Sequence, residues 1–289
     1  MSARFGPAGN AESFSKVHKS SLAAPAWIAQ QGLDCYEYQC GKGVHVGEDT
    51  ARKLGEKARE AGIALSVHAP YFINLANPDP ESRAKTTNYV LESCFVAQVM
   101  GAERIVIHSG ALMKRSRQEA LDIAKETLKQ VLEACDRQGY GNITLCPETM
   151  GKINQLGDLD EVLTLCTLDE RLIPCIDFGH LYARSLGELE GEQACREMLD
   201  KVERVLGEKR ASRFHSHFSR IEFTPNGGEK RHRTFADHGG FGPDWTPLAR
   251  EVARRGWSPT FICESAGTQA EDAQTMKKIY QGFCSSEEA

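Results

Sequence analysis

Short apolar runs rich in β-branched residues alternate with longer amphipathic stretches along almost the whole chain. Runs of the first kind are typical of buried strands, and the stretches between them are typical of helices. The predicted strands are 3–5, 35–38, 64–68, 104–108, 143–148, 173–177, 213–215 and 260–264. A helical stretch is predicted before residue 29, and further helices over 48–61, 80–100, 117–137, 158–166, 191–206, 243–256 and 269–283.

Eight strand-then-helix units indicate a particular closed fold. Strands that alternate with helices of this length pair in parallel through right-handed crossovers, and eight units are the number that closes a barrel. We therefore predict an α/β protein with one (β/α)8 TIM barrel domain over residues 1–289. The alternative is an open doubly wound sheet, but no Gly-x-Gly-x-x-Gly turn follows the first strand.

The composition is that of a globular protein with a sizeable core, with 40% apolar and 26% charged residues. No apolar run approaches the roughly 18 residues of a membrane span, and the first residues lack the apolar core of a signal peptide. The ten cysteines contain no Cys-x-x-Cys pair, which favours reduced, buried thiols. We expect a cytoplasmic monomer with no membrane partner.

The predicted strands end in residues that bind metals. In a closed parallel barrel, all strand carboxyl ends point into one mouth, where six consecutive strand ends carry such residues. A single histidine at such a position is more often an ordinary loop residue, but a whole group with this property is not explained in that way. The predicted ligands are His68, His108, Glu148, Asp177, His180, His215, His232 and Glu264.

The predicted cluster calls for positive charge, because crowded carboxylates repel one another. Mixed nitrogen and oxygen donors suit Zn²⁺, or Mn²⁺ or Fe²⁺, better than calcium or magnesium. The formal net charge of −5 argues against a broad basic surface for nucleic acid. Bound divalent ions would nevertheless concentrate positive charge in one cleft.

Five stretches carry a resemblance to a known family. They are 68–76 (HAPYFINLA), 107–110 (IHSG), 147–149 (PET), 176–180 (IDFGH) and 263–265 (CES). These stretches resemble the signature motifs of the endonuclease IV family, which are trinuclear zinc apurinic/apyrimidinic endonucleases on a TIM barrel. The similarity runs from about Cys35 onward, and the wider xylose isomerase-like superfamily shares the barrel and part of the metal geometry.

The resemblance implies a role for each matching position. His68 and His108 would hold one zinc ion, and Glu148 would bridge it to a second ion held by Asp177, His215 and Glu264. His180 and His232 would bind a third. Glu148, Asp177 and Glu264 would be the catalytic residues. Tyr71 and Asn74 match positions near the scissile bond.

Two departures from the family pattern affect these expectations. The family's third zinc ion also uses an Asp two residues before the loop histidine, and that position is Lys230 here. Glu229 or Asp237 would have to replace it through a shift of the loop, so we expect two or three ions. After the second strand, the basic residue that contacts DNA in the family has only Lys42 as a counterpart. Arg220 is a further candidate because its guanidinium matches phosphate oxygens.

The resemblance implies hydrolysis of double-stranded DNA on the 5′ side of abasic sites, in base excision repair, by a metal-bound hydroxide. Two alternatives remain open. One is a divalent-metal sugar or sugar-phosphate isomerase or epimerase of the same superfamily, with one ion held by Glu148, Asp177, His215 and Glu264. The other is a degenerate barrel that binds damaged nucleic acid without turnover.

Overall fold

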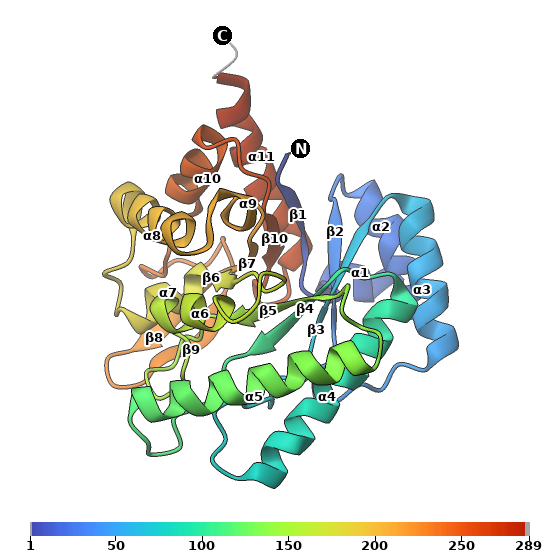
Figure 1. The fold of residues 1–289 in the computed structure, drawn as a ribbon. Helices are drawn as coiled ribbons and strands as arrows, with labels where there is room; N and C mark the ends of the chain where they lie inside the picture. The colour runs from blue at the N-terminus through green and yellow to red at the C-terminus, as the bar shows by residue number, and fades with distance from the viewer. Residues whose placement is uncertain (1, 287–289) are drawn as a thin grey trace.

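The computed structural model describes residues 2–286, and eight parallel strands form a nearly closed barrel at its centre (Figure 1). The strand order is β1-β10-β7-β6-β5-β4-β3-β2. Hydrogen bonds from Asp34 N–H to the Phe5 carbonyl (2.8 Å) and from Gly9 N–H to the Glu37 carbonyl (2.9 Å) join β1 to β2. The predicted TIM barrel is thereby confirmed. The barrel strands are β1 (Arg4–Pro7), β2 (Cys35–Gln39), β3 (Ala64–His68), β4 (Arg104–His108), β5 (Thr144–Glu148), β6 (Cys175–Asp177), β7 (His215–Phe218) and β10 (Thr260–Cys263).

Helices surround the strands, with α11 against β1 and β10 and with α3, α4 and α5 packed in succession (Figure 1). The longer ones are α3 (Glu48–Ala61), α4 (Pro80–Met100), α5 (Arg117–Arg137), α8 (Gly191–Leu206), α10 (Trp245–Arg254) and α11 (Gln269–Ser286). The shorter ones are α1 (Glu12–Val17), the 3₁₀ helix η1 (Ser21–Ala23), α2 (Ala24–Gln30), α6 (Leu159–Cys166), α7 (Phe178–Arg184) and α9 (Glu208–Ala211).

Local sequence explains where several helices begin and end. Gly62 and Gly101 follow α3 and α4 in the left-handed conformation that glycine adopts without strain. The side chains of Ser116 and Glu119 form a reciprocal capping box at the start of α5. These signals place α4 and α5 at the residues that the sequence predicts.

The main apolar core lies between the strands and the helices. Phe5 of β1 stacks on Phe261 of β10, and Trp245 of α10 packs edge-on against both rings. Inside the barrel, the apolar residues of the described chain form two small clusters. One is Val106, Cys146, Ile173 and Cys175, and the other is Ala8, Cys35 and Ile262. The rest of the interior is therefore available to polar side chains.

The structure differs from the sequence prediction after β7. The sequence pattern predicts no strand or helix over 216–242, but an antiparallel hairpin of β8 (Arg220–Thr224) and β9 (Gly228–Arg233) lies there. Strand β7 also starts two residues later than predicted, at His215, and continues to Phe218. None of the described helices is both long enough and apolar enough to span a bilayer.

Candidate metal centre

Glu148, the last residue of β5, lies at the centre of a cluster of histidines in the mouth of the barrel. Its Oε2 lies 3.3 Å from Nε2 of His68 and 3.3 Å from Nε2 of His108, the last residues of β3 and β4. Its Oε1 lies 3.1 Å from His217 Nδ1 and 3.5 Å from His180 Nδ1. The side chain is almost completely buried. One carboxylate therefore has histidines beside both of its oxygens.

A second group of side chains shares Glu148. It consists of Glu148, Asp177, His217 and Glu264, whose ligand atoms all lie within 4.8 Å of one another. Asp177 Oδ1 caps α7 by accepting the His180 backbone N–H at 2.7 Å, so the residue is both a helix cap and a member of the group. Its Oδ2 is buried without a hydrogen-bond partner. His180 Nδ1 lies 3.3 Å from that oxygen, but this nitrogen donates to the Thr149 carbonyl at 2.8 Å.

The unpartnered Asp177 oxygen is evidence on whether these residues fit a metal ion. A buried carboxylate oxygen without a donor destabilises a fold unless a cation meets it. Three carboxylates and an imidazole around one point are a complete donor set for a divalent ion. The residues of the second group therefore fit such an ion.

A third group lies beside the second, and its members are His180, Glu229 and His232. Glu229 Oε2 lies 3.6 Å from His180 Nε2, and the two imidazole rings are 5.6 Å apart. His232 shares a hydrogen bond of 2.7 Å between Nδ1 and the Ser219 hydroxyl, while its Nε2 lies 3.9 Å from Glu264 Oε2. Glu229 and Asp237 were the two residues that the sequence offered in place of the family's Asp. Of these, Glu229 is the one that lies in the third group.

A shift in the register of the hairpin explains the position of Glu229. Glu222 pairs with Arg231, whereas its neighbour Phe223 pairs with Glu229, so Lys230 is an extra residue in β9. An extra residue reverses the side-chain alternation, and Glu229 and His232 thereby reach the same face despite their odd spacing. The Lys230 ammonium instead pairs with Glu222 away from the mouth.

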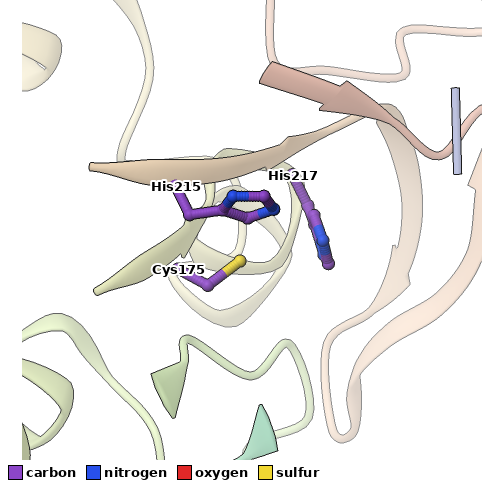
Figure 2. A group of neighbouring side chains, drawn as sticks. All are labelled: Cys175, His215 and His217. Carbon is purple, nitrogen blue, oxygen red and sulfur yellow. The ribbon is translucent and has the colours of Figure 1, made fainter. Parts of the chain in front are cut away.

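His215 does not occupy the predicted position at the end of its strand. It is the first residue of β7, completely buried, and its Nε2 lies 2.9 Å from Glu37 Oε2. Successive inward side chains of a strand are two residues apart, so His217 takes the ligand position one layer nearer the mouth. Figure 2 shows both imidazoles, with Cys175 of β6 nearby; the three offer ligand atoms within 4.8 Å of one another. The prediction that the strand ends at His215 is wrong.

Sequence reasoning missed Glu37 as well as His217. Glu37 lies in β2 and is completely buried inside the barrel, where it contacts both His215 and His217. The signal was present in the sequence, because the run Cys35–Gln39 places a carboxylate in the middle of a buried strand. A buried carboxylate needs partners, and a second histidine two residues after His215 is available to provide one.

The electrostatics of the cluster follow from burial opposed by charge. Burial raises the pKa of Glu148, but His217 and the hydrogen bonds from His217 and His68 outweigh it and hold this pKa well below its usual range. Burial also raises the pKa of Asp177, and there burial prevails. Burial lowers the pKa of His108 to about 4. Burial also lowers the pKa of His180, but the surrounding carboxylates, Asp177 foremost, outweigh burial and raise this pKa to about 9.

A cavity of about 290 Å³ lies over the three groups. Among its lining residues are His68, His108, Glu148, His180 and His232, with Tyr71 and Lys152. The Tyr71 side chain is 52% exposed. The predicted substrate contact Lys42 is exposed on the turn after β2, and the cavity is lined by its neighbour Gly41 rather than by Lys42 itself.

Two other predicted substrate contacts are engaged elsewhere. Asn74 Oδ1 accepts the backbone N–H groups of Ala76 and Ala111 and so joins two loops. The Arg220 guanidinium donates to the Phe235 carbonyl at 2.8 Å and lies over the Phe235 ring. Both side chains hold loop backbone in place, and neither lines the cavity.

Comparison with known proteins gives relatives of two kinds. The chain is 34% identical to the uncharacterized protein MJ0133 of Methanocaldococcus jannaschii, over 88% of this chain and 89% of that protein. It is 33% identical to the probable endonuclease 4 of Acholeplasma laidlawii, over 43% of this chain and 44% of that protein. Several further relatives also carry the name probable endonuclease 4, as the resemblance predicted.

Solved structures show the same fold at low sequence identity. A D-tagatose 3-epimerase-like protein superposes with a TM-score of 0.71 at 18% identity, covering 91% of this chain and 94% of that one. Endonuclease IV from Thermus thermophilus superposes with a TM-score of 0.64 at 18% identity, covering 93% of this chain and 95% of that one. Residues 25–280 match the Xylose isomerase-like TIM barrel family, and the chain therefore belongs to that family.

Proposed function

We propose that this protein is a metal-dependent phosphodiester hydrolase that cleaves damaged DNA on the 5′ side of abasic sites. The observation that carries the proposal is the number of histidines at the cavity that do not belong to the second group. His68, His108, His180 and His232 all line the same cavity, and a site for one ion needs none of them. The relatives named probable endonuclease 4 support a nuclease, although each match covers only part of the chain.

Three sets of residues would hold the ions. They are His68, His108 and Glu148; Glu148, Asp177, His217 and Glu264; and His180, Glu229 and His232. We propose Zn²⁺ for all three sets, since imidazole and carboxylate donors suit it, with Mn²⁺ or Fe²⁺ as substitutes. Bound divalent ions supply positive charge for the phosphate oxygens and lower the pKa of water.

The chain's own residues have separate tasks in this proposal. Glu148 would be shared by the first two sets, because its two oxygens face different histidines. The exposed ring of Tyr71 at the cavity would fill the gap that a flipped abasic nucleotide leaves in the duplex. An abasic nucleotide is easier to extrude than a normal one because no base stacking is lost at that position.

An incision assay tests the proposed activity. Zinc-loaded protein is incubated with a duplex oligonucleotide that carries one abasic site, and a Glu148→Gln variant is the control. The expected result is incision 5′ to the abasic site by the native protein and at least a hundredfold less by the variant. Absence of incision by protein with two or three bound ions per chain would refute the proposal. Tight duplex binding without turnover would then favour the non-catalytic alternative.

A sugar isomerase or epimerase is the second candidate. Glu148, Asp177, His217 and Glu264 form a complete set for one divalent ion by themselves, and epimerases share the fold. Metal analysis by mass spectrometry separates the two candidates. About one ion per chain, together with epimerisation of a ketose, would support the epimerase, whereas two or three ions support the nuclease.

A further inference from the structure

Beneath the metal centre, one buried carboxylate receives four hydrogen bonds. Glu37 Oε1 accepts from His217 Nε2 at 2.9 Å and from Gln39 Nε2 at 3.1 Å. Its Oε2 accepts from His215 Nε2 at 2.9 Å and from the Ser66 hydroxyl at 2.9 Å. No lysine or arginine of the described chain pairs with it within 4.0 Å, so the two histidines are its charge partners.

The hydrogen bond from His217 determines which of its nitrogens faces the metal centre. An imidazole that donates through Nε2 presents Nδ1 as the atom available to a metal. His217 Nδ1 lies 3.1 Å from Glu148 Oε1 and 3.5 Å from Glu264 Oε1, at the heart of the second ligand group. Glu37 below and the two carboxylates above therefore hold opposite edges of one ring.

His215 and Ser66 keep the carboxylate itself in place. His215 and His217 extend to the same side of β7, as Figure 2 shows, because they are two residues apart in a strand. Each uses Nε2 to donate to a different oxygen of Glu37. Ser66 adds a second donor to the oxygen that His215 contacts, so rotation of the carboxylate would break hydrogen bonds on both oxygens.

We propose that Glu37 is a positioning residue that fixes the tautomer and the ring orientation of His217, with His215 as its support. The proposal deepens the proposed function because it rests on His217 being a metal ligand. Carboxylates behind a ligating histidine orient the ring and increase its basicity, and their loss typically weakens metal binding about 10- to 100-fold. Glu37 would thus contribute to metal affinity without touching the ion.

Zinc affinity of a Glu37→Gln variant tests this role. Glutamine keeps the volume but offers one acceptor oxygen to two imidazole N–H groups and removes the negative charge. Competition with a chromophoric chelator should show zinc binding to the second group weakened about 10- to 100-fold. Ser66→Ala is the graded comparison: it removes one of the four hydrogen bonds to the same carboxylate but leaves the one from His217, so its zinc affinity should fall less than that of Glu37→Gln. Equal affinity in native protein and Glu37→Gln would overturn the proposal.

Nitrogen NMR of the native protein gives a second readout that needs no substitution. Long-range ¹H–¹⁵N correlations should show His217 of the zinc-loaded protein with its proton on Nε2 and the metal on Nδ1. The reverse assignment would refute the proposal even if Glu37→Gln fails to fold. Neither measurement uses DNA, so the two proposals can fail independently. If both results are as expected but the protein incises no DNA, the nuclease proposal is refuted and the role of Glu37 still stands.

A Cys175→Ser variant addresses a competing explanation of the inner residues. Cys175, His215 and His217 would otherwise be candidates for an ion of their own. If Glu37 occupies Nε2 of both histidines, this variant should retain the native number of zinc ions per chain. Loss of one ion would show that His217 serves the inner group instead, and this would overturn the proposal.

Discussion

Glu229 Oε2 lies 3.6 Å from His180 Nε2, although Lys230 stands at the spacing from His232 where an acidic residue is expected. The extra residue in β9 brings this about by turning Glu229 inward and Lys230 outward. The backbone of the hairpin, rather than the identity of one residue, thus decides what completes the third group.

We predict that Glu229→Gln removes about one zinc ion per chain. An amide cannot supply the negative charge that His180 and His232 need beside them to hold a divalent ion. Metal analysis after exhaustive dialysis provides the measurement. Lys230→Ala is the matched control, and it should keep the native stoichiometry because its side chain pairs with Glu222 outside the mouth. If Lys230→Ala loses a zinc ion and Glu229→Gln loses none, Glu229 is not the ligand of the third group.

Removal of metal should lower the thermal stability of the protein. An ion that binds only the folded state adds about 2.7 kcal/mol to the free energy of unfolding when its free concentration is 100 times Kd. The unpartnered Asp177 oxygen indicates that the second group gains most from an ion. Calorimetry with and without a chelator should therefore show a decrease of several degrees in Tm, which restored zinc should reverse. An unchanged Tm would argue against ions at these buried residues.

The metal-free protein should be most stable near pH 6.5, the ordinary pKa of histidine. Burial lowers the pKa values of His108 and His215 to about 4, so the unfolded chain binds more protons than the folded one between pH 6.5 and pH 4. Stability therefore falls as the pH falls through that window. The pKa of His180 is raised to about 9, so its contribution is complete below pH 6.5 and is lost as the pH rises through 9.

Denaturant unfolding of chelated protein from pH 4 to pH 9 measures this profile. A His180→Gln variant should make the alkaline limb shallower and leave the acidic limb in place; the alkaline decline that remains comes from His68 and His217, whose pKa values are also raised by neighbouring carboxylates. If the alkaline decline is the same in both proteins, His180 is not its cause. Zinc-loaded protein should show a different profile, since bound ions compete with protons for the same nitrogens.

Tyr71→Ala should weaken binding of an abasic duplex without changing the metal content. Stacking of an aromatic side chain on a base contributes about 1–3 kcal/mol, which corresponds to roughly a 5- to 150-fold change in Kd. Fluorescence anisotropy with a labelled duplex measures the affinity. Tyr71→Phe, which keeps the ring, is the control and should bind nearly as well as the native protein. Equal affinities for all three proteins would exclude Tyr71 from the DNA contact.

The sequence predicted the site residues best where the apolar run of a single strand shows at which residue that strand ends. His68, His108, Glu148 and Asp177 each close an apolar run, and each is the last residue of its strand in the structure. Their convergence follows from parallel barrel topology alone. For this part of the site, the pattern of the chain was sufficient.

The remaining members of the cluster depend on relationships between segments. Whether His215 or His217 reaches the mouth depends on where β7 pairs with its neighbours, and His215 lies opposite Cys175 and Thr260. The role of Glu229 depends on a register shift inside a hairpin whose strands carry mainly polar residues. Neither property can be obtained from the composition of one segment, because each is set by pairing with another.

The polar layer inside the barrel also has a thermodynamic consequence. Glu37, Ser66, His215 and His217 occupy interior positions that hydrocarbon side chains fill in many barrels, and only two small apolar clusters remain there. Exposure of apolar surface raises the heat capacity of a protein on unfolding, whereas exposure of polar surface lowers it. The heat-capacity change of this protein should therefore come almost entirely from the shell between strands and helices around Phe5, Trp245 and Phe261.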